Sequence, residues 1–155
     1  MRIGLGIDIH PFAEGRRLVL CGVEIPSRRG LAGHSDGDAA LHALMDALLG
    51  AACLGDIGEL FPPTPQWKDA CSLDLLAIVW SKVQAAGFHL VNADLVLLLE
   101  EPRIAPHREA MCRALRNAIP NAAFNVKAST TERLGFLGRE EGVAALVTVL
   151  LEEDR

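Results

Sequence analysis

Hydrophobic and polar residues alternate in several short segments of this chain. Alternation predicts β-strands, because successive side chains of a strand point to opposite faces. The clearest case is residues 2–9, where Ile and Leu alternate with Gly and Asp. Residues 17–25 contain two shorter runs around Cys21 and Gly22, which indicates a hairpin. Three further apolar runs predict strands at residues 88–99, 124–128 and 143–151.

Apolar residues at helical spacing predict three helices between these strands. The first covers residues 36–52, and we expect Ser35 to cap it because Asp38 follows three positions later, as in a capping box. The second covers residues 72–86 and the third covers residues 102–119.

Helices that alternate with strands predict an α+β fold, an α/β sandwich in which helices cover one face of a mixed four- to five-stranded sheet. We expect a single domain over residues 1–155. Residues 27–35 and 55–68 are interrupted by Gly and Pro, so we expect loops there. The last strand is apolar on both faces. The sheet face without helices should therefore pack on another subunit.

The composition of the chain limits which partners and which cellular compartment we expect. The net charge is −5 and aromatic residues make up 5% of the chain, which argues against a nucleic-acid-binding surface. The longest apolar run, residues 95–99, is too short to cross a membrane, and residues 1–10 do not resemble a secretory signal. The four cysteines form no CxxC pair, so we expect them to be small buried residues. These features favour a bacterial-type cytoplasmic protein.

A metal site is the first candidate for chemistry. Asp8 and His10 lie two positions apart on the first strand and should share one face. If the first helix packs over the strand end, His42 joins them, and one carboxylate with two imidazoles suits Zn²⁺ with an open fourth position. Alternatively, Asp8 caps a turn and His42 is an ordinary half-buried histidine. Asp38 and Asp46 flank His42, and one of them could accept its free ring N–H; otherwise they complement the helix dipole and face solvent.

Two other segments offer phosphate ligands. Residues 33–38 lead into the first helix, where backbone N–H groups are free to hold a phosphate. Residues 127–132 combine three hydroxyls with a carboxylate that suits Mg²⁺ or Mn²⁺. The alternative for this second segment is a capping box of Ser129 and Glu132. Arg139 either binds phosphate or is a surface charge.

Three long motifs, at residues 6–12 (GIDIHPF), 33–62 and 125–142, mark a family. Through them the chain resembles the 2-C-methyl-D-erythritol 2,4-cyclodiphosphate synthases of the non-mevalonate isoprenoid pathway. The resemblance implies a phosphorus–oxygen lyase that converts 4-diphosphocytidyl-2-C-methyl-D-erythritol 2-phosphate into the cyclic diphosphate and CMP. It also implies a homotrimer with active sites between subunits, with the open sheet faces around the trimer axis and a central cavity that could hold an isoprenoid diphosphate.

The resemblance assigns roles to residues of these motifs. The implied Zn²⁺ ligands are Asp8, His10 and His42. A second ion, Mg²⁺ or Mn²⁺, would be held by Glu132 and the substrate diphosphate. The implied transition-state stabilisers are His34 and Thr130. The implied substrate contacts are Asp8, His10, His34, Ser35, Asp56, Ile57, Gly58, Phe61, Leu99, Glu100, Glu101, Pro102, Arg103, Ile104, Ala105, Ser129, Thr130, Thr131, Glu132, Phe136 and Arg139.

The chain departs from the family pattern in a few places. Pro63 and Pro65 stand where the substrate loop usually carries carboxylates, Ser129 replaces a threonine, and Arg103 replaces a frequent lysine. Two other functions remain open for the same residues. One is a zinc-dependent phosphohydrolase that uses metal-bound hydroxide, and the other is a non-catalytic trimeric sensor of a nucleotide or an isoprenoid diphosphate.

Overall fold

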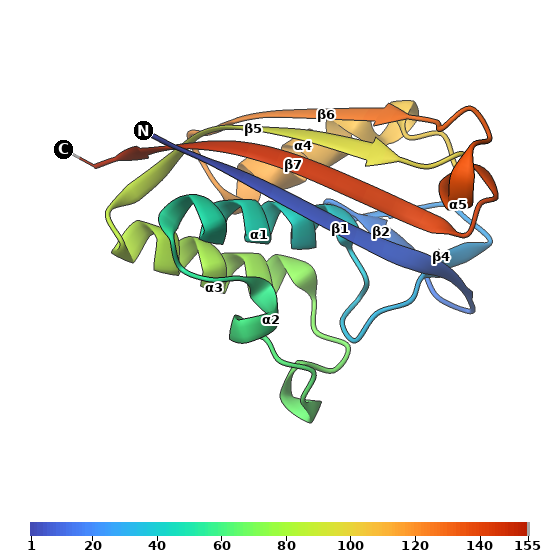
Figure 1. Ribbon diagram of the computed structural model, residues 1–155, viewed down its shortest axis with the longest axis horizontal. Helices are drawn as coiled ribbons and strands as arrows, with labels where there is room; N and C mark the ends of the chain where they lie inside the picture. The colour runs from blue at the N-terminus through green and yellow to red at the C-terminus, as the bar shows by residue number, and fades with distance from the viewer. Residues whose placement is uncertain (155) are drawn as a thin grey trace.

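The computed structural model describes residues 1–154 and contains a five-stranded sheet with helices against one face (Figure 1). In order across the sheet, its strands are β4 Arg29–Leu31, β1 Arg2–Glu14, β7 Gly142–Glu153, β5 Phe88–Leu98 and β6 Ala123–Ser129. Only β5 and β6 run parallel, and the other neighbours are antiparallel, so the sheet is mixed as the sequence predicts. A separate hairpin consists of β2 Leu18–Leu20 and β3 Val23–Ile25.

Three long helices lie on one side of this sheet (Figure 1). They are α1 Ala39–Ala52, α3 Ser72–Ala85 and α4 Arg108–Ala118. Helix α1 packs on β1 and β7, α3 packs on α1, and α4 packs on β6. Almost every residue of α1 is buried, because the helix lies between the sheet and α3. No helix in residues 1–154 has the length and apolar content needed to cross a membrane.

Helix α1 approaches β1 closely because glycines face it. A Cβ built on Gly6 would lie 1.8 Å from the Ala43 carbonyl oxygen, and one built on Gly4 would lie 1.9 Å from the Ala47 carbonyl oxygen. Alternation then places the large side chains of β1 on the opposite face of the sheet. These side chains are 50–75% exposed; they are Ile3, Leu5, Ile7 and Ile9.

Two of the predicted helix starts are wrong. The N-cap of α1 is Asp38, whose side chain accepts a hydrogen bond from Leu41 N, and not Ser35. The third helix begins at Arg108, after a 3-10 turn at Ala105–His107, because the prolines upstream keep residues 101–107 out of a regular α-helix.

The structure also corrects the predicted loops. Residues 55–68 contain the short helix α2 Ile57–Leu60 and a 3-10 turn at Pro65–Trp67, and residues 27–35 contain β4. No helix begins at residues 129–132, since Glu132 and the residue after it adopt left-handed backbone conformations. Instead, α5 Gly135–Gly138 follows.

The prediction that all four cysteines are buried is wrong, because only Cys21 is fully buried.

Candidate metal centre

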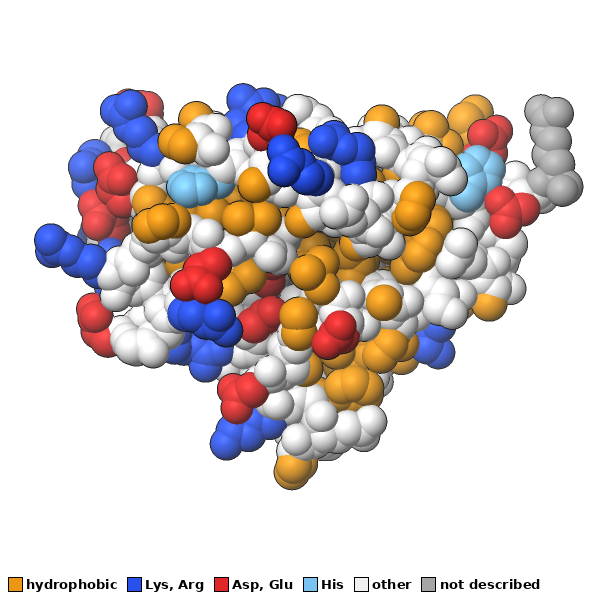
Figure 2. All heavy atoms as spheres, turned by 180° about the vertical axis from the view of Figure 1, so that it is seen from behind, with side chains coloured by type: hydrophobic (Ala, Val, Ile, Leu, Met, Phe, Trp, Pro, Cys, Tyr) orange, Lys and Arg blue, Asp and Glu red, His pale blue; other side chains and the backbone are white. Residues whose placement is uncertain are grey.

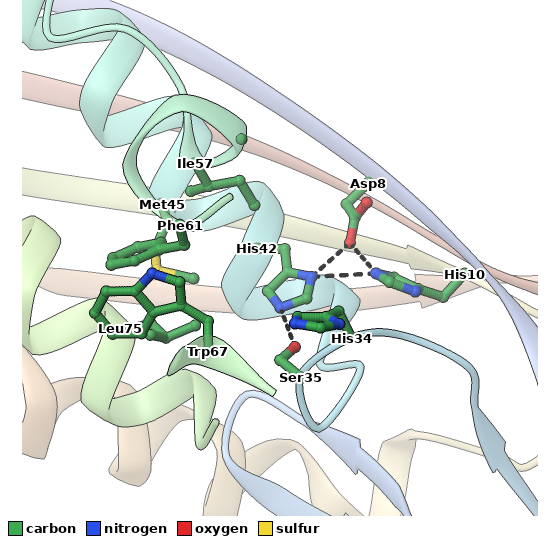
Figure 3. A pocket seen from close by; sticks show the side chains of 11 residues that line it. Asp8, His10, His34, Ser35, His42, Met45, Ile57, Phe61, Trp67 and Leu75 are labelled. Carbon is green, nitrogen blue, oxygen red and sulfur yellow. Dashed lines mark hydrogen bonds and ion pairs between the residues drawn. The ribbon is translucent and has the colours of Figure 1, made fainter. Parts of the chain in front are cut away.

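Three potential metal ligands meet where β1 passes the first turn of α1 (Figure 3). Asp8 and His10 project from β1, and His42 projects from the helix. Asp8 Oδ2 lies 2.8 Å from His10 Nε2 and 3.0 Å from His42 Nδ1, and the two nitrogens are 3.1 Å apart. Among residues 1–154, this is the one group of three such side chains with ligand atoms so close. The predicted juxtaposition is confirmed.

The local fold explains this meeting. Asp8 and His10 share the face of β1 that carries Gly4 and Gly6, because strand side chains repeat with a period of two. The glycines let α1 lie against the strand, so His42 reaches the same point.

His10 is oriented by the backbone. Its Nδ1 lies 2.5 Å from the Ala32 carbonyl oxygen. Because a carbonyl can only accept, Nδ1 carries the proton. Nε2 is therefore the nitrogen that faces Asp8 and can offer a lone pair to a metal.

The charges of the group favour a cation. Burial raises the pKa of the Asp8 carboxyl, but hydrogen bonds and charges from His10 and His42 outweigh burial and hold this pKa well below its usual range. Burial lowers the pKa of His10, but the hydrogen bond and charge of Asp8 outweigh burial and raise this pKa above its usual value. Asp8 therefore stays ionised and supplies the negative charge that a divalent ion needs.

The donor set fits zinc in chemistry and size. Tetrahedral zinc with bonds of about 2.0–2.1 Å has ligand atoms roughly 3.3 Å apart. The separations of 2.8–3.1 Å are shorter by only a few tenths of an ångström. One oxygen and two imidazole nitrogens leave a fourth position for another ligand.

A cavity of about 260 Å³ opens from the triad (Figure 3). Its polar side consists of the triad with His34 and Ser35. Its other side is formed by α1, α2, α3 and the segment between the last two, through Met45, Ile57, Gly58, Phe61, Trp67 and Leu75. The cavity thus joins a polar end to an apolar wall.

His34 connects this cavity to the proline-containing segment 61–71. Its Nε2–H donates to the Thr64 carbonyl oxygen at 2.8 Å, and Asp69 N donates to the His34 carbonyl oxygen at 2.8 Å. Phe61 and Trp67 pack edge to face within this segment. The segment is therefore held against the cavity by both backbone and aromatic contacts.

A second cavity of about 180 Å³ lies between the end of β5 and the end of β6. Its lining contains eight of the predicted substrate contacts, namely Leu99, Glu100, Pro102, Arg103, Ile104, Ala105, Ser129 and Thr130. The two cavities have no lining residue in common within the described chain. A single chain therefore carries two separate cavities, each lined by predicted site residues.

Comparison with known proteins identifies the family. A family model described as the YgbB family matches residues 1–152. The chain belongs to the YgbB family. A relative from Saccharophagus degradans named 2-C-methyl-D-erythritol 2,4-cyclodiphosphate synthase is 54% identical, with 98% of this chain and 100% of the relative aligned. A relative of the same name from Geobacillus thermodenitrificans is 53% identical, with 98% and 97% aligned.

Solved structures of this YgbB-family type have the same fold. A 2C-methyl-D-erythritol-2,4-cyclodiphosphate synthase in a CDP-bound form superimposes with a TM-score of 0.88 and 44% identity over 97% of this chain and 100% of that chain. The bifunctional IspDF from Campylobacter jejuni superimposes with a TM-score of 0.94 and 44% identity over 98% of this chain. This chain spans 42% of that longer protein.

The remaining residues implied for this YgbB-family chain lie outside the two cavities. Asp56 caps α2 by accepting from Glu59 N. Glu101 lines a neighbouring depression, and Phe136 is exposed in α5. Thr131 is tied to the Glu100 carboxylate through its backbone N–H and its hydroxyl, both at 3.0 Å.

The turn after β6 lies at a strongly charged end of the molecule. Figure 2 shows acidic and basic side chains gathered there, at the end opposite the chain termini. Arg133 pairs with Glu140 at 2.8 Å and Arg139 pairs with Glu141 at 2.6 Å. Glu132 accepts a hydrogen bond from the Thr130 hydroxyl at 3.0 Å, so its carboxylate lies beside the second cavity.

The sequence reasoning missed the groups that hold His42. Its Nε2 lies 3.0 Å from Ser35 Oγ and 3.1 Å from Ser72 Oγ. Asp46, which its spacing suggested as an acceptor for the His42 ring N–H, accepts instead from Ile57 N at 2.9 Å. Ser72 is thirty residues from His42 along the chain, and no spacing rule connects them.

Proposed function

We propose that this chain is a 2-C-methyl-D-erythritol 2,4-cyclodiphosphate synthase. Its substrate is 4-diphosphocytidyl-2-C-methyl-D-erythritol 2-phosphate, and its products are the 2,4-cyclodiphosphate and CMP. The observation that carries the proposal is the Asp8–His10–His42 group at one end of a cavity, in a chain whose relatives bear this name over their whole length.

The reaction needs neither a protein nucleophile nor water. An oxygen of the 2-phosphate attacks the β-phosphorus, a new P–O bond forms, and the bond to the cytidine-side phosphate breaks with CMP as the leaving group. Two anionic groups must approach each other, so the enzyme must neutralise charge and hold both ends of the substrate in line. A site with fixed cationic and hydrogen-bonding groups meets both needs.

The residues of the first cavity supply the donors. Asp8, His10 and His42 would hold Zn²⁺, and the ion would supply Lewis acidity toward a phosphoryl oxygen. Ser35 Oγ receives bonds from Gly37 N at 3.3 Å and from the His42 ring, so its own proton is free to be donated to phosphate. The apolar wall, with Ile57 and Phe61, packs on the carbon skeleton of the methylerythritol.

The second cavity holds the cytidine side. The segment from Leu99 to Ala105 would line the nucleoside. The Thr130 hydroxyl, which donates to Glu132, would turn to donate to the diphosphate instead. The Glu132 carboxylate would hold Mg²⁺ or Mn²⁺, which would neutralise charge on the diphosphate. Holding CMP by its phosphate lowers the barrier to its departure.

The two half-sites come together in a homotrimer. The sheet face opposite the helices exposes an apolar row on β1, which a partner subunit would cover. The zinc half-site of one subunit then faces the cytidine half-site of the next, and the open sheet faces surround the threefold axis. The central cavity of this trimer takes an isoprenoid diphosphate, with Arg139 near the anion.

The test is product analysis with a ligand variant. We expect wild type to release CMP and form a cyclic diphosphate, seen by phosphorus NMR, without incorporating ¹⁸O from labelled water. His42→Ala should stay folded, lose zinc by metal analysis and lose at least about 100-fold in activity, because metal-ligand loss removes the charge neutralisation.

Two outcomes would reject the proposal. Uptake of ¹⁸O into the product would indicate a zinc-dependent phosphohydrolase. Tight binding of the substrate with no turnover in the presence of zinc and Mg²⁺ or Mn²⁺ would indicate a sensor.

A further inference from the structure

His42 differs from His10 in how its second ring nitrogen is held. The backbone holds His10, whereas side chains hold His42 Nε2. One of these, Ser72, is fully buried and is the first residue of α3. A buried hydroxyl beside a proposed metal ligand is a candidate for a role beyond packing.

Asp36 lies behind Ser72. Its carboxylate accepts from Ser72 N at 2.9 Å and from the Ser72 hydroxyl. Asp36 is itself fixed, because its carboxylate accepts from Asp38 N at 3.2 Å and its own N–H donates to the Ala70 carbonyl oxygen at 3.1 Å. The loop before α1 and the start of α3 are thus joined directly beside His42.

The directions of these hydrogen bonds determine where the His42 proton lies. An ionised carboxylate only accepts, so the Ser72 hydroxyl must donate to Asp36. The Ser72 oxygen is then free to accept from His42 Nε2–H at 3.1 Å, and it shares this proton with Ser35 Oγ at 3.0 Å. With its proton on Nε2, the ring presents the Nδ1 lone pair toward Asp8 and His10.

We infer that Asp36 and Ser72 are positioning residues that fix the tautomer and orientation of His42 for metal binding. This inference rests on the metal centre of the proposed function. The chain Asp36 carboxylate–Ser72 hydroxyl–His42 imidazole also makes Nδ1 a more basic ligand. A purely structural link between loop and helix would need only the bond from Ser72 N to Asp36, which leaves His42 untouched.

Two substitutions separate these roles. Ser72→Ala keeps the backbone bond to Asp36 and removes only the hydroxyl. Asp36→Asn can place an amide N–H against the Ser72 hydroxyl, which turns the hydroxyl proton toward His42 and favours the tautomer with the proton on Nδ1. We expect each to weaken zinc binding by about 10- to 100-fold.

Matched controls lie on the same helix. Ser81→Ala and Asp74→Asn make the same chemical changes at exposed positions of α3. Zinc affinity is measured by chelator competition on all four variants and on wild type. Asp8→Asn serves as the reference for loss of a ligand. In parallel, ¹H–¹⁵N NMR of the zinc-loaded protein with labelled histidine reports the His42 Nε2–H, which should exchange slowly in wild type and faster in Ser72→Ala.

The outcomes distinguish the inference from the proposed function. Wild-type zinc affinity in either Ser72→Ala or Asp36→Asn overturns the inference and leaves the metal centre standing. If the wild-type protein binds no zinc, or if the Asp8→Asn variant binds zinc as tightly as wild type, both the metal centre and the inference are rejected. If Ser72→Ala does not fold, Asp36→Asn and the wild-type spectrum decide, and a zinc-loaded His42 without a proton on Nε2 overturns the inference.

Discussion

At the residue scale, three aspartates near α1 have different roles, although their side chains are chemically the same. Asp8 belongs to the candidate metal centre, Asp36 accepts the hydrogen bond of the Ser72 hydroxyl, and Asp38 joins the β2–β3 hairpin to the helix. The Asp38 carboxylate is fully buried and accepts from Cys21 N at 3.0 Å, Gly22 N at 2.7 Å and Leu41 N at 3.0 Å. Three backbone donors on one buried carboxylate make this residue a structural anchor.

Asp38 should also make stability depend on pH. Burial raises its pKa from 3.8 to about 6, against the lowering effect of its backbone hydrogen bonds. The folded state then holds the Asp38 proton more tightly than the unfolded state does. This contribution to stability is fully present below pH 4 and is lost as the pH rises through about 6.

Urea denaturation of wild type and of Asp38→Asn, from pH 4 to pH 7, compares their free energies of unfolding. We expect the variant to be less stable at pH 4, because its amide cannot accept from all three N–H groups. The advantage of wild type should shrink by an amount on the order of 3 kcal/mol by pH 7. An advantage that stays constant or grows with pH would contradict the raised pKa, and Asp74→Asn at an exposed site should show no such trend.

At the scale of elements, the contact between β1 and α1 decides whether the triad can form. The strand presents glycines to the helix, so the backbones approach closely enough for His42 to reach Asp8. The same alternation sends the large apolar side chains of β1 to the other face.

The same substitution should have opposite effects at two glycines. Gly6→Ala would place a methyl group against the Ala43 carbonyl oxygen, and we expect a loss of about 1–3 kcal/mol or more in the free energy of unfolding. Gly50→Ala lies in exposed helix with no atom within 4 Å of the new Cβ, so a gain of about 0.5–1 kcal/mol is expected. Chemical denaturation measures the free energy of unfolding of both variants. Equal effects of the two substitutions would show that the close approach of α1 to β1 does not depend on a glycine at position 6.

At the scale of the whole molecule, the arrangement of two separate cavities and an exposed apolar face favours assembly. Val143, Ala145 and Val147 of β7 are buried against the helices, while the neighbouring β1 residues on the opposite face are open. The helices of the described chain therefore cover one face of its sheet, and the other face stays exposed, as the proposed assembly requires.

Leu5→Glu tests this assembly. Leu5 is 61% exposed in the single chain, and a buried carboxylate at a threefold interface would be repelled by its copies. We expect light scattering to show a monomer and CMP release to be lost, although the zinc ligands are intact. Ile78→Glu, on the outer side of α3, should leave both the trimer and the activity unchanged. A monomeric Leu5→Glu protein with full activity would contradict the shared site.

Local patterns in the sequence determined the main elements and the metal ligands. Residues 72–85 and 88–98 matched their predictions closely, because helical and strand periodicity are local signals. Asp8 and His10 were found because two positions on a strand share a face. His42 required one added assumption, that the helix packs over the strand end.

The tertiary structure alone decided what depends on contacts between distant segments. The N-cap of α1 is Asp38 and not the predicted Ser35. The Asp38 carboxylate accepts from Leu41 N in the helix and also from Cys21 N and Gly22 N in the hairpin, and no local pattern predicts this second contact. Ser72 became the partner of His42 because α3 begins beside α1, a distance that no periodicity encodes. Periodicity shows which face a side chain occupies, but which groups meet across faces is determined by packing.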